Sequence, residues 1–286
     1  MIVIHHGRAE DILPTIPAAS VDSVVTDPPY PEIDRPYGRM TEAEWFAMMR
    51  VVVAECRRIL KPSGSAVFIL QANSERVGRM RPWLWDFMAW AAREHGIVQD
   101  AYWWNHCAPP TVHTHRTRGL MRPSVKACVW VGPEDCYRDQ EAVLLPIAEA
   151  TLTDKRIDRH ELDRHPSGFT QRRGRVLQTC AERGGATPYN LLVCGNSDSA
   201  NGAGINGHGA GTPYSVADWW IRYITPDNGT TCDPFAGSGT MLMAAKDQNL
   251  NAIGIEKESQ YVETARRRVA ATADRPLLSV SVPCPG

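Results

Sequence analysis

The chain has 286 residues, 43% of them hydrophobic and 22% charged, and a formal net charge of −1. This is the composition of an ordinary globular protein, and the length suits one large α/β domain or a domain with an insertion. The near-zero net charge excludes a global basic field, so a nucleic-acid partner would have to be held by a local basic patch.

The eight cysteines are scattered along the chain, and none forms a C-x-x-C pair. The sequence also shows no signal peptide and no apolar run long enough to span a membrane. We therefore expect reduced thiols in a cytoplasmic protein. The nine histidines lack cysteine or carboxylate partners at ligand spacing, so no metal site is expected.

The first part of the chain predicts two short strands, at 2–4 and 21–26, with a weak helix at 9–13 between them. A longer helix begins at Thr41-Glu42-Ala43-Glu44, which is a capping box: a hydroxyl N-cap with glutamate at the third helical position. Its apolar residues recur at helical spacing, so we expect one face to pack on a sheet. Lys61-Pro62-Ser63-Gly64 is expected to end this helix.

The next stretch continues the alternation of strands and helices. A strand at 66–70 is apolar on both faces, as in a covered parallel sheet. A second amphipathic helix is expected at 83–95, ended by Gly96. Further strands are expected at 101–104 and 124–131.

From residue 133 to residue 204 the regular patterns degrade, which indicates an insertion. Between 151 and 190 there are eight lysines and arginines against five acidic residues, with glycines interspersed. The stretch 197–211 is rich in Gly, Asn and Ala and is expected to be flexible.

Regular patterns return near Thr212-Pro213. They predict a helix at 215–224, a strand at 230–232, a helix at about 239–248, a strand at 251–256, a helix at 259–271 and a disordered tail at 274–286. The arginines 266–268 near the end of the last helix are expected to complement its dipole.

The tetrapeptide Asp27-Pro28-Pro29-Tyr30 directly follows the predicted strand at 21–26. Two prolines cannot continue a strand, because neither donates a backbone hydrogen bond and both fix φ. The turn leaves the Asp27 carboxylate, the Pro28 carbonyl and the Tyr30 ring at the carboxyl end of the strand, where open α/β sheets bind ligands. A plain Asp-Pro turn on the surface is the alternative interpretation.

A second element, Asp233-Pro234-Phe235-Ala236-Gly237-Ser238-Gly239-Thr240, follows a predicted strand and opens a helix. Its glycines let the backbone approach a ligand at the helix N-terminus, but it is neither a dinucleotide fingerprint nor a Walker A loop. Glu256 lies 23 residues beyond Asp233, at the end of the next strand. A carboxylate there can bind ribose hydroxyls, which suggests a nucleoside cofactor such as S-adenosylmethionine; a purely structural crossover is the alternative.

Together the two elements resemble the signatures of the S-adenosylmethionine-dependent DNA amino-methyltransferases, D/N/S-P-P-Y/F and D-P-F-x-G-S-G-T. The tetrapeptide comes first, then a variable region, then the glycine element, an order similar to the circularly permuted β class of this family. The resemblance covers roughly residues 1–132 and 205–271. The chain departs from the family at Gly7-Arg8, where Gly-Asp is usual.

The resemblance implies a fold: an α/β, Rossmann-like methyltransferase, circularly permuted, with a mostly parallel seven-stranded sheet and helices on both faces. Residues 1–132 would form the catalytic half of the domain. Residues 133–204 would be an inserted target-recognition region, and 205–273 the cofactor-binding half.

The resemblance also implies S-adenosyl-L-methionine as the cofactor and a base flipped out of double-stranded DNA as the substrate. Asp27 and Pro28 would accept the two N–H bonds of the exocyclic amine, Pro29 would complete the stiff turn, and Tyr30 would stack on the base. The amine would then attack the methyl group directly and in line. The residues assigned to the cofactor are Asp233, Phe235, Ala236, Gly237, Ser238, Gly239, Thr240, Glu256, Lys257, Thr212 and Pro213.

Two groups of arginines are candidates for DNA contact, since arginine suits phosphates and guanine edges. They are Arg116, Arg118 and Arg122 in the loop at 105–123, and Arg172, Arg173 and Arg175 in the insertion. A solvated surface loop is the alternative for both groups.

The target base is less well specified by the sequence than the reaction. Aspartate at the first position of the tetrapeptide favours the N6 amine of adenine, and the N4 amine of cytosine is the near alternative. Methylation of RNA or of a protein glutamine is disfavoured, because those enzymes normally place the cofactor element first. A non-catalytic DNA-binding relic is a further alternative, and a homodimer and a paired restriction enzyme are left open.

Overall fold

The computed structural model describes residues 1–34, 38–76, 78–108, 119–147, 163–164, 170–171, 173–195 and 211–272, with the backbone alone for 163–164, 170–171 and 173–177. Within these residues the chain divides into two compact units. The larger contains Met1–Arg138 and the chain from Asn190 onward, and the smaller contains Asp139–Tyr189. None of the described helices is long and apolar enough to cross a membrane.

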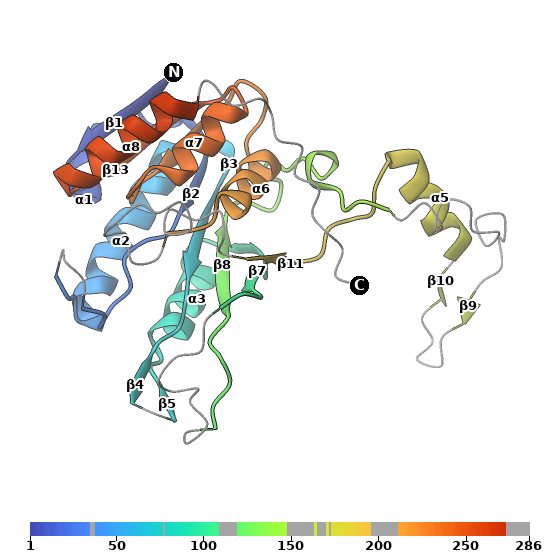
Figure 1. The fold of residues 1–286 in the computed structure, drawn as a ribbon, viewed down its shortest axis with the longest axis horizontal. Coiled ribbons are helices and arrows are strands. Elements are labelled where there is room, and N and C mark those ends of the chain that lie inside the picture. The colour runs from blue at the N-terminus through green and yellow to red at the C-terminus, as the bar shows by residue number, and fades with distance from the viewer. Residues whose placement is uncertain are drawn as a thin grey trace. The chain divides into compact units, whose positions relative to one another are not determined.

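A nine-stranded sheet forms the centre of the larger unit (Figure 1). Its strands are β1 (Ile2–His6), β2 (Val21–Thr26), β3 (Leu60–Leu70), β6 (Ile97–Gln99), β7 (Tyr102–Asn105), β8 (Val125–Val131), β11 (Leu191–Cys194), β12 (Thr230–Asp233) and β13 (Asn251–Glu256). They are ordered β1-β13-β12-β2-β3-β8-β7-β11, and β6 pairs with β8 off this path. The run from β1 to β3 is parallel, β8 is antiparallel to β3 and to β7, and β11 is parallel to β7.

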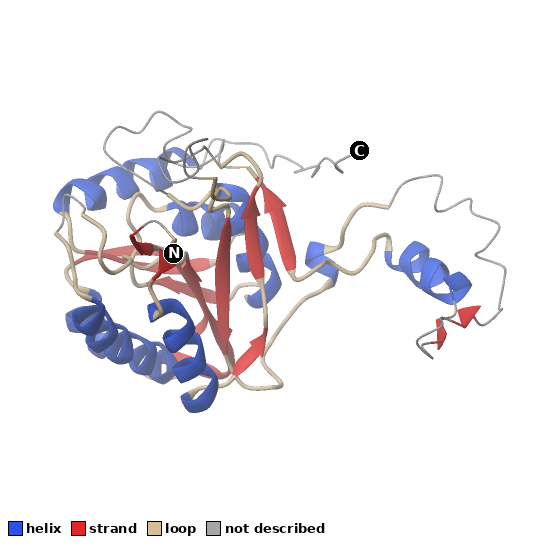
Figure 2. Ribbon diagram, turned by 90° about the horizontal axis from the view of Figure 1, so that it is seen from below, coloured by secondary structure: helices blue, strands red, loops and turns tan. Residues whose placement is uncertain are grey.

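Helices cover both faces of this sheet, so that the strands lie between two helical layers (Figure 2). The apolar faces of α1 (Ala9–Ile12), α2 (Glu42–Ile59) and α3 (Trp83–Glu94) share one core with the sheet. Those of α6 (Tyr214–Ile224), α7 (Thr240–Asp247) and α8 (Ser259–Ala271) belong to the other. This confirms the predicted α/β architecture with a mostly parallel, doubly covered sheet.

Helix α2 begins at the predicted capping box. The Thr41 hydroxyl accepts a hydrogen bond from the Glu44 backbone N–H at 3.2 Å, and the Glu44 carboxylate accepts one from the Thr41 N–H at 2.8 Å. Trp45, Met49 and the later members of its apolar stripe are fully buried, as the helical spacing predicts.

The end of α2 differs from the sequence-based expectation. The chain passes directly into β3 at Leu60, and residues 61–64 belong to the strand rather than to a loop. They are accommodated as an irregularity, because Val21 pairs with Leu60 whereas Ser23 already pairs with Ser65. A bulge of this kind tolerates Pro62, and Lys61 forms an ion pair with Asp22 at 2.9 Å beside it.

Two further strands exceed the seven expected. Strand β6 has three residues and β11 has four, and neither stretch is long enough to show a clear periodicity. Strand β11 falls inside the predicted insertion at 133–204, yet it pairs with β7 in the main sheet. The part of that insertion which lies outside the sheet is therefore shorter than the sequence suggested.

The smaller unit contains helix α5 (Arg173–Arg183) and a two-stranded pairing of β9 (Asp163–Arg164) with β10 (Thr170–Gln171). Within it, Leu145 and Ala186 exchange backbone hydrogen bonds at 2.8 and 2.9 Å, and Arg183 contacts Glu141 at 2.7 Å. A second hairpin, β4 (Ser74–Arg76) with β5 (Arg79–Met80), belongs to the larger unit.

Candidate active site

The tetrapeptide and the glycine element meet at one edge of the sheet. Strands β2 and β12 are parallel neighbours, so both of their carboxyl ends lie at this edge. The Thr26 hydroxyl donates a 2.6 Å hydrogen bond to the Asp233 carboxylate, across 207 residues of sequence. Asp27 and Asp233 therefore belong to one site, as the resemblance required.

The turn Asp27–Tyr30 is held from several directions. The Tyr30 hydroxyl donates to Asp27 Oδ1 at 2.6 Å, and the buried Trp45 donates its Nε1–H to the Pro29 carbonyl at 2.6 Å. Asn73, just after β3, donates to the carbonyl of Pro31 at 2.7 Å. These bonds fix the turn in place before any substrate arrives, which is the pre-organisation that a catalytic geometry needs.

Two donors from distant parts of the chain reach the other oxygen of Asp27. Lys126 Nζ lies 3.0 Å from Oδ2, and the Thr212 hydroxyl donates to the same atom at 2.6 Å. Thr212 was expected to serve the cofactor, but the structure joins it to the tetrapeptide. Lys126 was not among the predicted site residues. The one signal for it in the sequence is a lysine within the otherwise apolar strand β8.

The glycine element turns sharply between β12 and α7. Gly237 and Gly239 have φ values of 50° and 83°, a left-handed conformation that glycine adopts without strain. A side chain at Gly239 would also meet Ala265 of α8 at 2.9 Å. Both the left-handed backbone conformation and the close approach of Ala265 therefore favour glycine at position 239.

Arg268 of α8 forms hydrogen bonds to the glycine element. Its guanidinium donates to the Ser238 carbonyl and hydroxyl, each at 2.7 Å, and to the Thr240 hydroxyl at 3.3 Å. The expectation that this arginine merely complements the helix dipole was therefore wrong, because it bonds to the glycine element itself. Its neighbours Arg266 and Arg267 are exposed.

Glu256 ends β13 beside the same loop. Its two carboxylate oxygens accept the backbone N–H groups of Gly237 and Glu258, each at 2.8 Å, and burial raises its pKa. A carboxylate has about four acceptor positions, so this one can still accept hydroxyl groups. Together with the left-handed glycines, this set of groups fits the ribose of a nucleoside cofactor.

Strand β1 brings the N-terminal segment to the same place. The Gly7 N–H donates to the carbonyl of Glu256 at 3.0 Å, and His6 Nε2 lies 3.1 Å from the carbonyl of Lys257. Arg8, which replaces the family's usual aspartate, is largely exposed and contacts Glu10 at 2.7 Å.

Asp233 is buried beneath the glycine element. Its Oδ1 accepts hydrogen bonds from Thr26 and from the Phe235 N–H at 3.1 Å. Burial outweighs these bonds and raises the pKa of Asp233 to about 7. Of the remaining residues assigned to the cofactor, Lys257 directly follows Glu256 and Pro213 is the N-cap of α6. The others form the loop itself: Phe235, Ala236, Gly237, Ser238, Gly239 and Thr240.

The arginines expected to contact DNA are only partly described. Arg122 is exposed just before β8, and its guanidinium donates to the Ala108 carbonyl at 3.2 Å. Arg173 and Arg175 lie in α5, whose backbone alone is described there, and Arg116, Arg118 and Arg172 fall outside the described residues.

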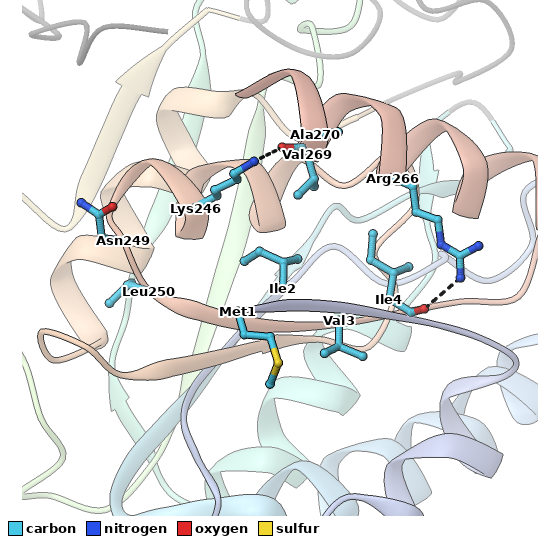
Figure 3. Close-up of a pocket in the computed structure, with 10 residues that line it drawn as sticks. All are labelled: Met1, Ile2, Val3, Ile4, Lys246, Asn249, Leu250, Arg266, Val269 and Ala270. Atoms are coloured by element: carbon cyan, nitrogen blue, oxygen red, sulfur yellow. Dashed lines mark hydrogen bonds between the residues drawn. The ribbon is translucent and has the colours of Figure 1, made fainter. Parts of the chain in front are cut away.

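A hollow of about 720 Å³ lies elsewhere, against the edge strand β1 and between it and the helices α7 and α8 (Figure 3). Met1 to Ile4 line one side, and Arg266 donates to the Ile4 carbonyl at 3.4 Å. None of its lining residues belongs to the tetrapeptide or to the glycine element, so the candidate active site is separate from it.

Comparison with known proteins agrees with this geometry. The sequence model of a family described as DNA methylase matches residues 21–267, a range that begins with β2 and ends within α8. The chain belongs to the DNA methylase family. The family comprises S-adenosylmethionine-dependent DNA amino-methyltransferases, which confirms the resemblance stated from the two motifs.

Individual relatives share only part of their sequence with this chain. Type II methyltransferase M.PvuII of Proteus hauseri is 26% identical over 92% of this chain and 82% of its own length. The solved structure of PvuII DNA methyltransferase (cytosine-N4-specific) covers 96% of the chain and 90% of its own, with a TM-score of 0.68 and 21% identity. The M1.HpyAVI–SAM complex covers 94% and 99%, with a TM-score of 0.58 and 18% identity. These likenesses confirm the methyltransferase fold.

Proposed function

We propose that this DNA methylase transfers a methyl group to the exocyclic N6 amine of adenine within a specific double-stranded DNA sequence. The observation that carries the proposal is the junction at the sheet edge, where Thr26 links the tetrapeptide strand to Asp233 at 2.6 Å. That bond supports the proposal, because it joins the ends of the two adjacent strands that carry the proposed amine-binding and cofactor-binding groups.

The tetrapeptide supplies the amine-binding part of the reaction. The target base must leave the duplex, because its amine is otherwise engaged in pairing. Asp27 and the Pro28 carbonyl accept the two N–H bonds of the amine and leave the nitrogen lone pair free. Tyr30 stacks on the base, and the Asp27 carboxylate stabilises the positive charge that develops on the nitrogen.

The second half of the site holds the cofactor. S-adenosyl-L-methionine, when bound, supplies an electrophilic methyl group. Glu256 binds the ribose hydroxyls, the loop from Asp233 to Thr240 shapes the cavity around the nucleoside, and Lys257, Thr212 and Pro213 complete it. No covalent link to the protein is needed, so the residues contribute by positioning, which can account for about 7–11 kcal/mol of a barrier.

Cytosine is the second candidate base, and a specific observation favours it. The PvuII DNA methyltransferase structure that resembles this chain is a cytosine-N4-specific enzyme. The exocyclic amine of cytosine offers the same two N–H bonds to Asp27 and Pro28, so the roles of the residues would not change. We place adenine first because the tetrapeptide begins with aspartate.

The DNA surface belongs to the proposal as well. The smaller unit and the exposed Arg122 would contact the target sequence, with the arginines at 172, 173 and 175 on phosphates or guanine edges. The relative M.PvuII is a Type II methyltransferase, and a cognate restriction enzyme is part of the proposed setting.

Mass-spectrometric nucleoside analysis tests the proposal. The purified protein is incubated with unmethylated duplex DNA and S-adenosylmethionine, and the DNA is then digested to nucleosides. We expect N6-methyladenine. N4-methylcytosine would move the proposal to its second candidate, and no methylated base would contradict both and point to RNA, to protein, or to a non-catalytic relic.

A further inference from the structure

Lys126 is a largely buried cation in the candidate site. It lies in β8, whose other residues are largely apolar, and its side chain is 12% exposed. Its ammonium lies 3.0 Å from Asp27 Oδ2, and the Asp27 side chain is itself only 16% exposed. A buried charge of this kind is costly unless it is paired and has further partners.

Two aromatic rings provide those further partners. The ammonium lies 5.4 Å from the centroid of the Tyr30 ring and 5.0 Å from that of Trp103. Both distances are within the range at which the face of a ring attracts a cation. The lysine is thus held against the catalytic carboxylate and against the ring expected to stack on the target base.

The register of the sheet explains why the lysine reaches this place. Strand β8 is antiparallel to β3, and Ala127 pairs with Leu70 at the carboxyl end of β3. Lys126, one residue earlier, pairs with Trp103 of β7. The lysine therefore enters the sheet at the edge where the tetrapeptide leaves β2.

The contacts of Asp27 determine what this cation can do. Oδ1 accepts from Tyr30, and Oδ2 accepts from Lys126 and Thr212. Since a carboxylate has about four acceptor positions, these donors fix its orientation and leave room for the target amine.

We propose that Lys126 is a positioning residue for methyl transfer, which holds the Asp27 carboxylate oriented toward the incoming amine. This inference rests on the proposed function of Asp27. It assigns to β8 a role that neither sequence motif contains.

Among the described residues, several titratable groups face Asp27. From β8 these are Lys126 and Cys128, from its own loop Tyr30, and from β12 Asp233. Thr212 adds a neutral hydroxyl. Because Asp233 and Cys128 are unchanged in a Lys126 variant, a comparison with the wild type isolates the effect of the ammonium.

The first test needs neither cofactor nor DNA. The carboxyl groups of aspartate are labelled with ¹³C, and the Asp27 signal is assigned by its loss in Asp27→Asn. In Lys126→Met we expect the ¹³C chemical shift of the Asp27 carboxyl carbon at neutral pH to differ from that of the wild type, because one of the two donors on Oδ2 is gone. Lys126→Arg, which keeps a charged donor there, restores the wild-type chemical shift, and Lys126→Gln serves in place of Lys126→Met if that variant fails to fold.

A matched control comes from the opposite end of β2. Lys61 of β3 pairs with Asp22, the second residue of β2, in a similar contact at 2.9 Å. Lys61→Met should therefore leave the Asp27 signal unchanged. An unshifted Asp27 in folded Lys126→Met or Lys126→Gln overturns the inference, whatever the protein methylates.

The second test connects the pair to the reaction. The kcat of methyl transfer should fall by about tenfold or more in Lys126→Met and recover in Lys126→Arg, with cofactor affinity within twofold of wild type. If the Asp27 signal moves but kcat does not, Lys126 is only a structural counter-ion and the inference fails. If the wild type transfers no methyl group while the Asp27 signal behaves as expected, the failure belongs to the proposed function instead.

Discussion

At the scale of single residues, Asp233 gives the site a carboxyl group that titrates near neutrality. Its pKa is raised by burial from an ordinary 3.8 to about 7. Between these two values the unfolded chain has lost a proton that the folded chain keeps. Stability therefore falls as the pH rises through this window and is constant above it.

Asp233→Asn should remove this dependence, because an amide oxygen can still accept the hydrogen bonds of Thr26 and Phe235. We expect the variant to gain stability relative to wild type between pH 5 and pH 8, on the order of 2 kcal/mol. Urea unfolding at the two pH values measures it. A difference between variant and wild type that does not change with pH contradicts the assignment.

The sequence predicted the residues whose type carries chemistry in a short motif, such as Asp27, Tyr30 and Glu256. It did not predict Lys126, although this lysine contacts Asp27 at 3.0 Å across 99 residues. That contact depends on the antiparallel register of β8 against β3, which no local pattern specifies. Thr212 was predicted as a site residue, but its 2.6 Å hydrogen bond to Asp27 Oδ2 was not, for the same reason.

At the scale of elements, the hydrogen bonds between Arg268 of α8 and the glycine element are the contacts that a substitution can test most simply. Arg268 makes two charge-assisted hydrogen bonds to Ser238 at 2.7 Å, and such bonds contribute about 1.5–3 kcal/mol each. Arg268→Ala should weaken S-adenosylmethionine binding by about tenfold or more, as measured by calorimetry.

Arg267 is the matched control for this experiment. It is adjacent, exposed, and makes a long contact of 3.4 Å with Thr264 of its own helix. Arg267→Ala should keep the wild-type cofactor affinity. Equal S-adenosylmethionine affinities of the Arg268 and Arg267 variants would show that the hydrogen bonds of Arg268 to Ser238 do not shape the cofactor loop.

Most elements with a cap or a sustained period could be predicted from the sequence. The helix α2 begins at its capping box and α3 ends before Gly96, whose φ is 76°. The bulged start of β3 could not be predicted, because Pro62 and Gly64 are read locally as a helix stop. Its extended conformation depends on pairing with Val21 and on the ion pair of Lys61 with Asp22.

At the scale of the whole molecule, the sheet brings together two motifs that stand in permuted order in the sequence. Strand β12, from the last quarter of the chain, pairs with both β13 and β2. Two motifs about 200 residues apart thereby share one sheet edge. The family resemblance, which rests on the order of the motifs, predicted that the two motifs share one site. The extent of the insertion between them could not be derived from the sequence, because β11, which lies within the predicted insertion, pairs with β7 in the sheet.

The proposed DNA surface is a property of the whole chain and is tested by salt dependence. Replacing Arg172, Arg173 and Arg175 together by alanine should lower DNA affinity and reduce the slope of log K against log salt concentration by about three, since each phosphate contact contributes about 0.9. The control is the alanine triple variant of the exposed residues Arg93, Arg266 and Arg267. It should change both the DNA affinity and the salt slope less strongly. Equal behaviour of the two triple variants would exclude these arginines from the DNA surface.

The central claim is that the two motifs divide the reaction, with the tetrapeptide holding the amine and the glycine element holding the cofactor. The most direct test is the transfer of a tritium-labelled methyl group from S-adenosylmethionine to duplex DNA by Asp27→Ala at saturating cofactor. We predict that transfer falls by about 100-fold or more, while calorimetry shows unchanged cofactor affinity. Transfer at the wild-type rate would contradict the account, because the amine would then not depend on Asp27.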